Sequence, residues 1–278
     1  MHLRGALAGP ETPERQNSFK FRIIGKVEAS GAGTTIKMET EAAAGYTWKV
    51  KGSERTLICD STHLKVSTNG KEEMDFTADR NRFKFVQGDK HEDVDFDHAP
   101  QRTRDMLRSC YELPLCKLTV DENGRETGRE VLATGAAKVI LADKGAITNA
   151  TFFHPPFFAD KKEWTAPAML SIGGANVVQG DLTYARIADE KGLATFKVTG
   201  TLTNDGFTEP GSKFTEKGMR HVITGKHSYD PLLHEWVAGS LTIATSSQTF
   251  SNGQQVGGMQ GTMEAEFERL DGKPVIKP

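Results

Sequence analysis

The second half of the chain alternates apolar and polar residues over long runs, and this period of two constrains the fold more than any other feature. Successive side chains of a β-strand point to opposite faces, so the alternation predicts strands with one buried and one solvated face. Turn residues separate the runs, as in Asp-Glu-Lys-Gly at 189–192 and Ser-Asn-Gly at 251–253. The pattern predicts an antiparallel meander with strands at 168–172, 177–187, 194–203, 220–229, 236–246 and 259–270.

Composition supports the same interpretation. The 278 residues include 28 Gly and 28 Thr; Thr suits a pleated, half-exposed surface and Gly suits turns and bulges. An apolar content of 37% fits sheets with one wet face better than a parallel sheet covered on both sides. The net charge of −2 argues against a sequence-independent nucleic-acid partner, which would need a surplus of Lys and Arg. No apolar stretch is long enough for a transmembrane helix.

The sequence of the first half of the chain predicts a second β unit with one short helix. Residues 1–17 contain two prolines and no apolar period, so they are expected to form a flexible arm. A stripe of Met106, Leu107, Cys110 and Tyr111 predicts a helix near 101–111, and 115–120 with 126–132 predicts a hairpin. We therefore expect a mainly β (α+β) protein with long, curved antiparallel sheets and one or two short helices. Its parts are an arm at 1–17, a β unit at 18–134, a connector at 135–165 and a meander at 166–278.

The connector holds the most unusual local feature, four phenylalanines around the pair Pro155-Pro156. Such a segment could enter a membrane interface, hold a hydrophobic ligand or plug the open end of a curved sheet. We favour the plug, which would also act as a lid. The candidate ligand-binding residues are Phe152, Phe153, Phe157, Phe158 and Trp164.

Two polar groupings could carry other chemistry. On a strand, Asp93, Asp95 and Asp97 would share one face and could collect a hard cation such as calcium, although the solvated face of a strand is the simpler interpretation. His221 and His227 lie six residues apart on one predicted strand, a spacing compatible with metal binding or acid–base work. The favoured explanation is that each histidine is simply packed in the sheet or solvated.

Known catalytic motifs are absent from the sequence. There is no Gly-x-Ser-x-Gly, His-Glu-x-x-His, Walker loop or dinucleotide fingerprint, so we expect neither an enzyme nor a cofactor. The three cysteines lack the spacing of a zinc site. If the protein is exported, Cys110 and Cys116 are close enough in sequence to form a disulfide.

The order of elements adds a resemblance. The hairpin that starts at 120–124, the Pro–aromatic linker leading to Trp164 and a long-stranded meander carrying Tyr229-Asp230 resemble uncharacterised bacterial secreted β-sheet proteins. Their curved sheet is similar to the half-barrel of lipoprotein carriers. The chain departs from that pattern at Lys162-Glu163, where a Gly-Asp and a polar residue usually precede the Trp. The resemblance implies an extracytoplasmic (periplasmic or secreted) location, after removal of a leader, and a lipid-binding or apolar-ligand concavity.

Three function hypotheses follow. The first is a non-enzymatic cell-envelope or secreted binding protein that holds an apolar small molecule or lipid against the concave side of the sheet. Its inward rows would include Val198, Thr199 and Leu202 against Ile243 and Met263, and a concave side filled by side chains would count against it. The second is a structural or protein-interaction module with a protein partner. The third is a metal-dependent hydrolase using His221, His227 or the Asp93–Asp97 row.

Overall fold

The computed structural model describes residues 14–31, 33–171, 176–190, 192–208 and 211–270. The first half contains β1 (Arg15–Gly31), β2 (Thr34–Lys51), β3 (Glu54–Thr68), β4 (Lys71–Asp79), β5 (Arg82–Gln87), β6 (Lys90–Asp95), η1 (Phe96–His98), α1 (Gln101–Tyr111), β7 (Pro114–Val120) and β8 (Glu126–Val131). The connector contains α2 (Gly135–Ile140), η2 (Ala142–Lys144) and α3 (Ala146–Phe152). The meander follows as β9 (Glu163–Ser171), β10 (Val177–Glu190), β11 (Leu193–Thr208), β12 (Phe214–Asp230), β13 (Glu235–Ser251) and β14 (Gln254–Arg269).

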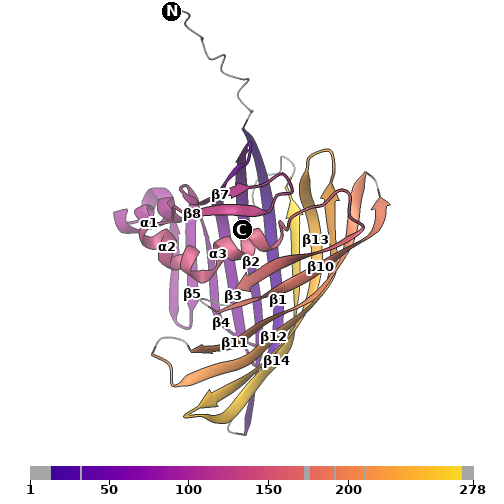
Figure 1. The fold of residues 1–278 in the computed structure, drawn as a ribbon. Coiled ribbons are helices and arrows are strands. Elements are labelled where there is room, and N and C mark those ends of the chain that lie inside the picture. Colours follow the sequence, from indigo (N-terminus) through magenta and orange to yellow (C-terminus); the bar gives the residue numbers. More distant parts are fainter. Residues whose placement is uncertain (1–13, 32, 172–175, 191, 209–210, 271–278) are drawn as a thin grey trace, which may run out of the picture.

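All strands belong to one antiparallel sheet, which confirms the predicted fold class. The strand order is β6-β5-β4-β3-β2-β1-β14-β13-β12-β11-β10-β9, and the hairpin β7–β8 joins it through pairing of β7 with the first part of β3. The helices and the β7–β8 hairpin lie across one side of the curved sheet (Figure 1). The two predicted β units therefore share one sheet, through the pairing of β1 with β14.

Alternation along the strands separates the core from the solvated face. In β14, Met263, Ala265 and Phe267 are buried, while the three glutamates between and after them are exposed. Phe21 pairs with Phe267 in the register of β1 and β14, so the buried rows of the two strands coincide. These rows belong to one apolar cluster that runs through both halves of the chain and includes Phe152 and Phe153. A one-residue shift would turn each row to water, so burial specifies the register.

The helix predicted near 101–111 is confirmed as α1, whereas α3 was not predicted. Leu107, Cys110 and Tyr111 form the buried face of α1, as the apolar stripe indicates. The sequence of α3 holds β-branched residues after a glycine and is a weak helix former. Gly145 precedes it with φ +88°, and a Cβ there would meet the Ser171 side chain at 2.2 Å. Contact with β9 therefore decides where α3 begins.

Glycines on the concave face let the meander curve tightly. A Cβ at Gly225 would lie 2.1 Å from the Ser240 carbonyl oxygen of the neighbouring strand, so only glycine fits the backbone there. Val198, Leu202 and Ile243 are fully buried and Met263 is 3% exposed.

Thr199 belongs to the opposite row, paired with Thr183 and Thr224. Side chains thus fill the concave face at the rows where the sequence places a ligand. This outcome counts against a carrier whose ligand lies on these rows.

All three cysteines are buried free thiols, so the disulfide considered possible between Cys110 and Cys116 is not formed. Cys110 lies on the buried face of α1. Cys116 lies on β7, where its register partners are Leu57 and Val131. The two thiols therefore lie on different elements, and burial raises the pKa of Cys116 to about 12.

Candidate functional site: a cleft between two sheet edges

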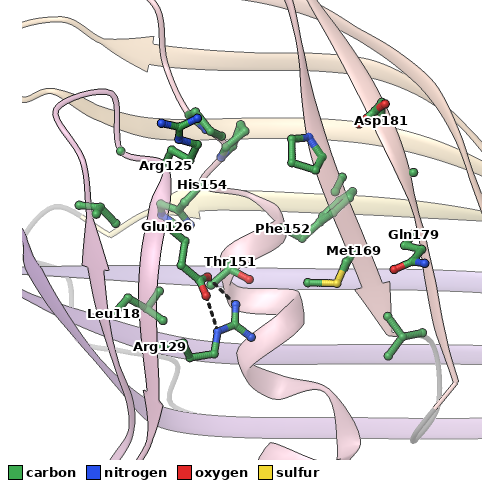
Figure 2. Close-up of a pocket in the computed structure, with 18 of the residues that line it drawn as sticks. Leu118, Arg125, Glu126, Arg129, Thr151, Phe152, His154, Met169, Gln179 and Asp181 are labelled. Carbon is green, nitrogen blue, oxygen red and sulfur yellow. Dashed lines mark hydrogen bonds and ion pairs between the residues drawn. The ribbon is translucent and has the colours of Figure 1, made fainter.

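A cleft of about 1000 Å³ lies between β8 and β9. Figure 2 shows Glu126 and Arg129 on one side and Met169 and Gln179 on the other, with Phe152 between them. β8 pairs only with β7, and β9 only with β10, among the strands that the structure describes. The cleft therefore lies where the sheet remains open between two free edges.

The edge of β9 is partly capped from α3. The Asn149 side chain donates from Nδ2 to the Ser171 carbonyl at 2.9 Å and accepts from the Ser171 N–H at Oδ1, also 2.9 Å. These two bonds copy the pairing that a further strand would make. In a strand, the N–H and C=O groups of residues i and i+2 point to the same edge. The backbone N–H and C=O of Met169 therefore face the same free edge as those of Ser171. Pro167, which has no N–H, is tolerated at such an edge.

The cleft reaches around the edge of β9. Its lining includes Ala168 and Tyr184 from the buried rows of β9 and β10, together with Met169 and Gln179 from the opposite rows. Met169 is 43% exposed, one of the larger apolar side chains left open to solvent. Leu118 and Phe152 add apolar surface from β7 and α3. The cleft is thus apolar over part of its wall and polar over the rest.

The Pro–Phe segment is anchored to three other parts of the chain. The Trp236 indole N–H donates to the Pro155 carbonyl at 2.7 Å, and the Phe157 N–H donates to the Asn123 carbonyl at 2.8 Å. The Phe157 ring stacks on Tyr229 with centroids 3.7 Å apart. The segment is therefore held to β12, β13 and the β7–β8 turn.

The predicted ligand-binding aromatics separate into two groups. Phe152 lines the cleft, and Phe157 lines a second cavity of about 720 Å³. Phe153 is buried among Phe21, Phe267 and His227. Phe158 and Trp164 pack against each other and line neither space. Whether any of the five binds a ligand stays a prediction.

The second cavity adjoins the cleft and shares part of its wall. The shared lining residues are Arg55, Val120, Gly124, His154 and Pro155. His154 donates from Nδ1 to the Ala150 carbonyl at 3.0 Å, and burial lowers its pKa to about 4. The imidazole is therefore neutral at neutral pH, so it brings no cation to the junction.

Arg55 differs from the other arginines around the two spaces. Arg129 forms a bidentate pair with Glu126, at 2.8 and 2.6 Å, and Arg125 pairs with Asp121 at 3.0 Å. In the described part of the chain no hydrogen bond or ion pair reaches Arg55, and its Nε is buried without a partner. Burial lowers the pKa of Arg55, an effect that Glu235 opposes. Sequence reasoning missed this residue because nothing local distinguishes it from a solvated arginine.

The histidines considered for catalysis lie in the core. His221 and His227 are 1% and 0% exposed, and burial lowers the pKa of His227 to about 3. Phe153, Trp236 and Phe267 surround the His227 ring. Both side chains are thus neutral packing groups in this structure.

The row of carboxylates expected at 93–97 is not formed. β6 ends at Asp95, and Asp97 falls in the 3-10 helix that follows. Asp93 forms a bidentate pair with Arg82 at 2.8 and 2.7 Å. Among the described residues no group of three His, Cys, Asp or Glu side chains is placed to hold a metal ion.

A smaller hollow of about 550 Å³ lies on the solvated face of β1–β6. Most of its charges form ion pairs: Arg22 with Glu41 at 2.8 Å, Lys84 with Asp75 at 3.0 Å, and Arg82 with Asp93. The Ser61 hydroxyl is buried there without a hydrogen-bond partner among the described residues. With its charges neutralised locally, this hollow offers less to a ligand than the cleft does.

Comparisons with known proteins give no family. The chain matches no protein-family model and no curated protein sequence. A structure titled "Bacterial polysaccharide outer membrane secretin" is similar at TM-score 0.26 and 8% identity, over 91% of this chain and 98% of that one. OccK5 (OpdH) of Pseudomonas aeruginosa is similar at TM-score 0.23 and 7% identity, over 92% and 98%. These scores are too low to support a shared fold.

The described helices are too short or too polar for any of them to cross a bilayer.

Proposed function

We propose that this protein is a non-enzymatic binding protein that holds an apolar or lipid-like molecule in the cleft between β8 and β9. The observation that carries the proposal is the cleft itself, an open space of about 1000 Å³ between two free sheet edges whose wall is partly apolar. Its volume is at the upper end of the range typical of small-molecule sites. The proposal moves the ligand from the filled concave rows to the place where the sheet stops.

The cleft fits a molecule with both apolar and polar parts. Leu118, Phe152 and Met169 offer apolar contact, while Gln179 and Asp181 offer hydrogen-bonding groups along the β10 wall. Burying apolar ligand surface there would supply most of the affinity, and the polar groups would orient the molecule. An extracytoplasmic location, implied by the resemblance of the sequence, is part of the proposal, and cell fractionation tests it.

Native mass spectrometry of the full chain purified from its own host tests the function directly. A stoichiometric apolar molecule, identified after organic extraction, is the expected result. The second measurement is a titration with a neutral apolar fluorophore, N-phenyl-1-naphthylamine. An empty protein that also shows no saturable binding would contradict the proposal.

A pair of tryptophan variants locates the binding site. Met169→Trp places a bulkier ring where the ligand would lie, so we expect the dissociation constant of the fluorophore to rise about fivefold, which corresponds to about 1 kcal/mol of binding free energy. Thr165→Trp is the control, because Thr165 is exposed on the same strand and lines neither the cleft nor the second cavity. Equal effects of both substitutions would place the binding elsewhere.

The alternative function is a protein-interaction module, favoured by the free edges of the sheet. An edge strand can pair with a partner's strand. β9 is protected by Pro167 and by the Asn149 cap, and β6 is short and carries five charged or histidine side chains, Lys90, His91, Glu92, Asp93 and Asp95. Size-exclusion chromatography with light scattering distinguishes the functions, since a monomer with bound lipid supports the carrier and a concentration-dependent dimer supports the module.

A further inference from the structure

We propose that Arg55 binds an anionic head group, so that the ligand of the cleft is an anionic amphiphile carrying a carboxylate or a phosphate. This inference rests on the proposed function and names its ligand class. It is carried by the position of one unpaired guanidinium at the junction of two cavities.

The backbone fixes Arg55 at this junction. It lies near the start of β3, where Val50 of β2 and Leu118 of β7 are its register partners on either side. Its Nη2 comes so close to the β7–β8 turn that a Cβ on Gly124 would be 3.6 Å away. Gly124 has φ +77°, and the absence of a side chain there leaves the guanidinium open to both spaces.

The charges that face Arg55 are already committed elsewhere. Glu235 accepts from Asn17 at 2.7 Å and pairs with Arg269 at 3.1 Å. Asp121 accepts from Arg125 and from the backbone of its own turn. Arg15, also on the wall of the second cavity, adds a further positive charge. Neither Glu235 nor Asp121 therefore forms an ion pair with Arg55.

A partly buried cation without a counterion is costly unless a partner completes it. The guanidinium is the protein group best suited to bidentate recognition of carboxylates and phosphates. An anion arriving at the junction would satisfy it, while the attached chain would extend along Phe152 and Met169 into the cleft. The apolar wall and the cation thus select different ends of the same molecule.

The test compares ligands that differ only in the head group. Oleate, oleyl alcohol and oleoyl lysophosphatidic acid are titrated against the full chain by displacement of N-phenyl-1-naphthylamine. We expect oleate or the phosphate to bind about tenfold more tightly than the alcohol, as a charge-assisted hydrogen bond predicts. The stronger of the two acids identifies the head group.

Arg55→Gln provides the matched variant, with Arg102→Gln on the exposed face of α1 as the control. Arg55→Gln should weaken the acid about tenfold and leave the alcohol unchanged, and Arg102→Gln should behave as wild type. Thermal unfolding of Arg55→Gln verifies its fold. If that variant does not fold, the comparison of acid and alcohol in the wild-type protein decides alone.

The failures are distinguishable. Equal affinity of the wild type for acid and alcohol, or an equal loss of both in Arg55→Gln, overturns the anionic head group and leaves the binding function standing. Absence of saturable binding for all three ligands overturns the binding function and the inference together.

Discussion

The concave interior of the meander and the cleft between β8 and β9 belong to the same sheet, but side chains fill the first and leave the second open. In the interior, fully buried side chains such as Leu182, Ile223 and Ile243 leave no room. In the cleft, the pairing stops, and the space between the two edges stays open with an exposed Met169 and an unpaired Arg55. The interior is where the protein obtains stability, and the cleft is where we place its function.

The physical reason for the difference is strand pairing. Inside the meander every strand has two neighbours, and glycines such as Gly225 let the sheet curve until its side chains meet. At β8 and β9 each strand has one described neighbour. The Asn149 side chain takes the place of a pairing strand at the Ser171 backbone. Four predictions test this separation of roles.

Truncating the Phe153 side chain should have the largest effect on the free energy of unfolding. Phe153→Ala deletes a ring that is 2% exposed and contacts Phe21, Phe152, Phe267 and His227, at a cost of about 3–5 kcal/mol in the free energy of unfolding. Urea unfolding measures it. The folded fraction should bind the neutral fluorophore as wild type does, and a large loss of affinity would mean that interior and cleft are not separate.

Mild acid should destabilise the interior by a similar amount. Burial holds the pKa of His227 near 3 and that of His154 near 4, against an ordinary 6.5. Between each folded-state pKa and 6.5, the unfolded chain binds more protons than the folded one. The histidines' contribution to the free energy of unfolding is therefore fully present above pH 6.5 and decreases as the pH falls. At about pH 5 the loss is about 2 kcal/mol for each histidine.

Chemical denaturation between about pH 7.5 and pH 5 tests this linkage. The variant His227→Phe should lose about 2 kcal/mol of the pH dependence, while His154 and His221, whose pKa values burial also lowers, keep their shares. His91→Gln, on the exposed part of β6, is the control and should keep the wild-type slope. A wild-type slope in His227→Phe would show that other groups govern the acid response.

Adding one methyl group where two strands approach closely should lower the free energy of unfolding by about 3 kcal/mol. In Gly225→Ala the new Cβ meets the Ser240 carbonyl oxygen, whereas at Gly206, on β11, a Cβ would find its nearest neighbour at 3.7 Å. Overpacking of the first kind is destabilising, and Gly206→Ala should change stability little. Equal melting temperatures of the two variants would contradict the view that glycine permits the curvature.

The smallest effect is expected at the border of the two regions. Asn149→Ala removes both bonds to the Ser171 backbone, at a cost of about 1–2 kcal/mol. Hydrogen exchange of the Ser171 amide should accelerate. Asn149→Asp keeps the acceptor and should preserve protection of that amide. Unchanged exchange in the alanine variant would show that the cap does not hold the edge.

Much of the architecture was predictable from the sequence, and particular residues show why. The alternation Met263, Ala265, Phe267 with glutamates between them is a local pattern that indicates a half-buried strand wherever it occurs. Asn69-Gly70 and Asn252-Gly253 all have positive φ, as their turn chemistry predicts. The stripe of α1 is equally local. The strands run longer than predicted because pairing with a neighbour extends β12 and β13 beyond their apolar rows.

The site was predictable only in part. The Phe-rich segment stood out by composition, yet only Phe152 and Phe157 reach the two cavities, because the others pack against side chains of distant strands. The disulfide and the carboxylate row failed for a related reason. Their sequence proximity says nothing about the layer or element in which each residue ends.

By itself the sequence determined the periodicity of the strands, the turns between them and helix α1, since each depends on residues within a few positions of one another. The tertiary structure decided the pairing of β1 with β14, the opening between β8 and β9, and the isolation of Arg55. A strand edge is open, or a charge unpaired, because no other strand or opposite charge lies within bonding distance of it. That depends on how segments far apart in the chain pack, and no local pattern encodes it.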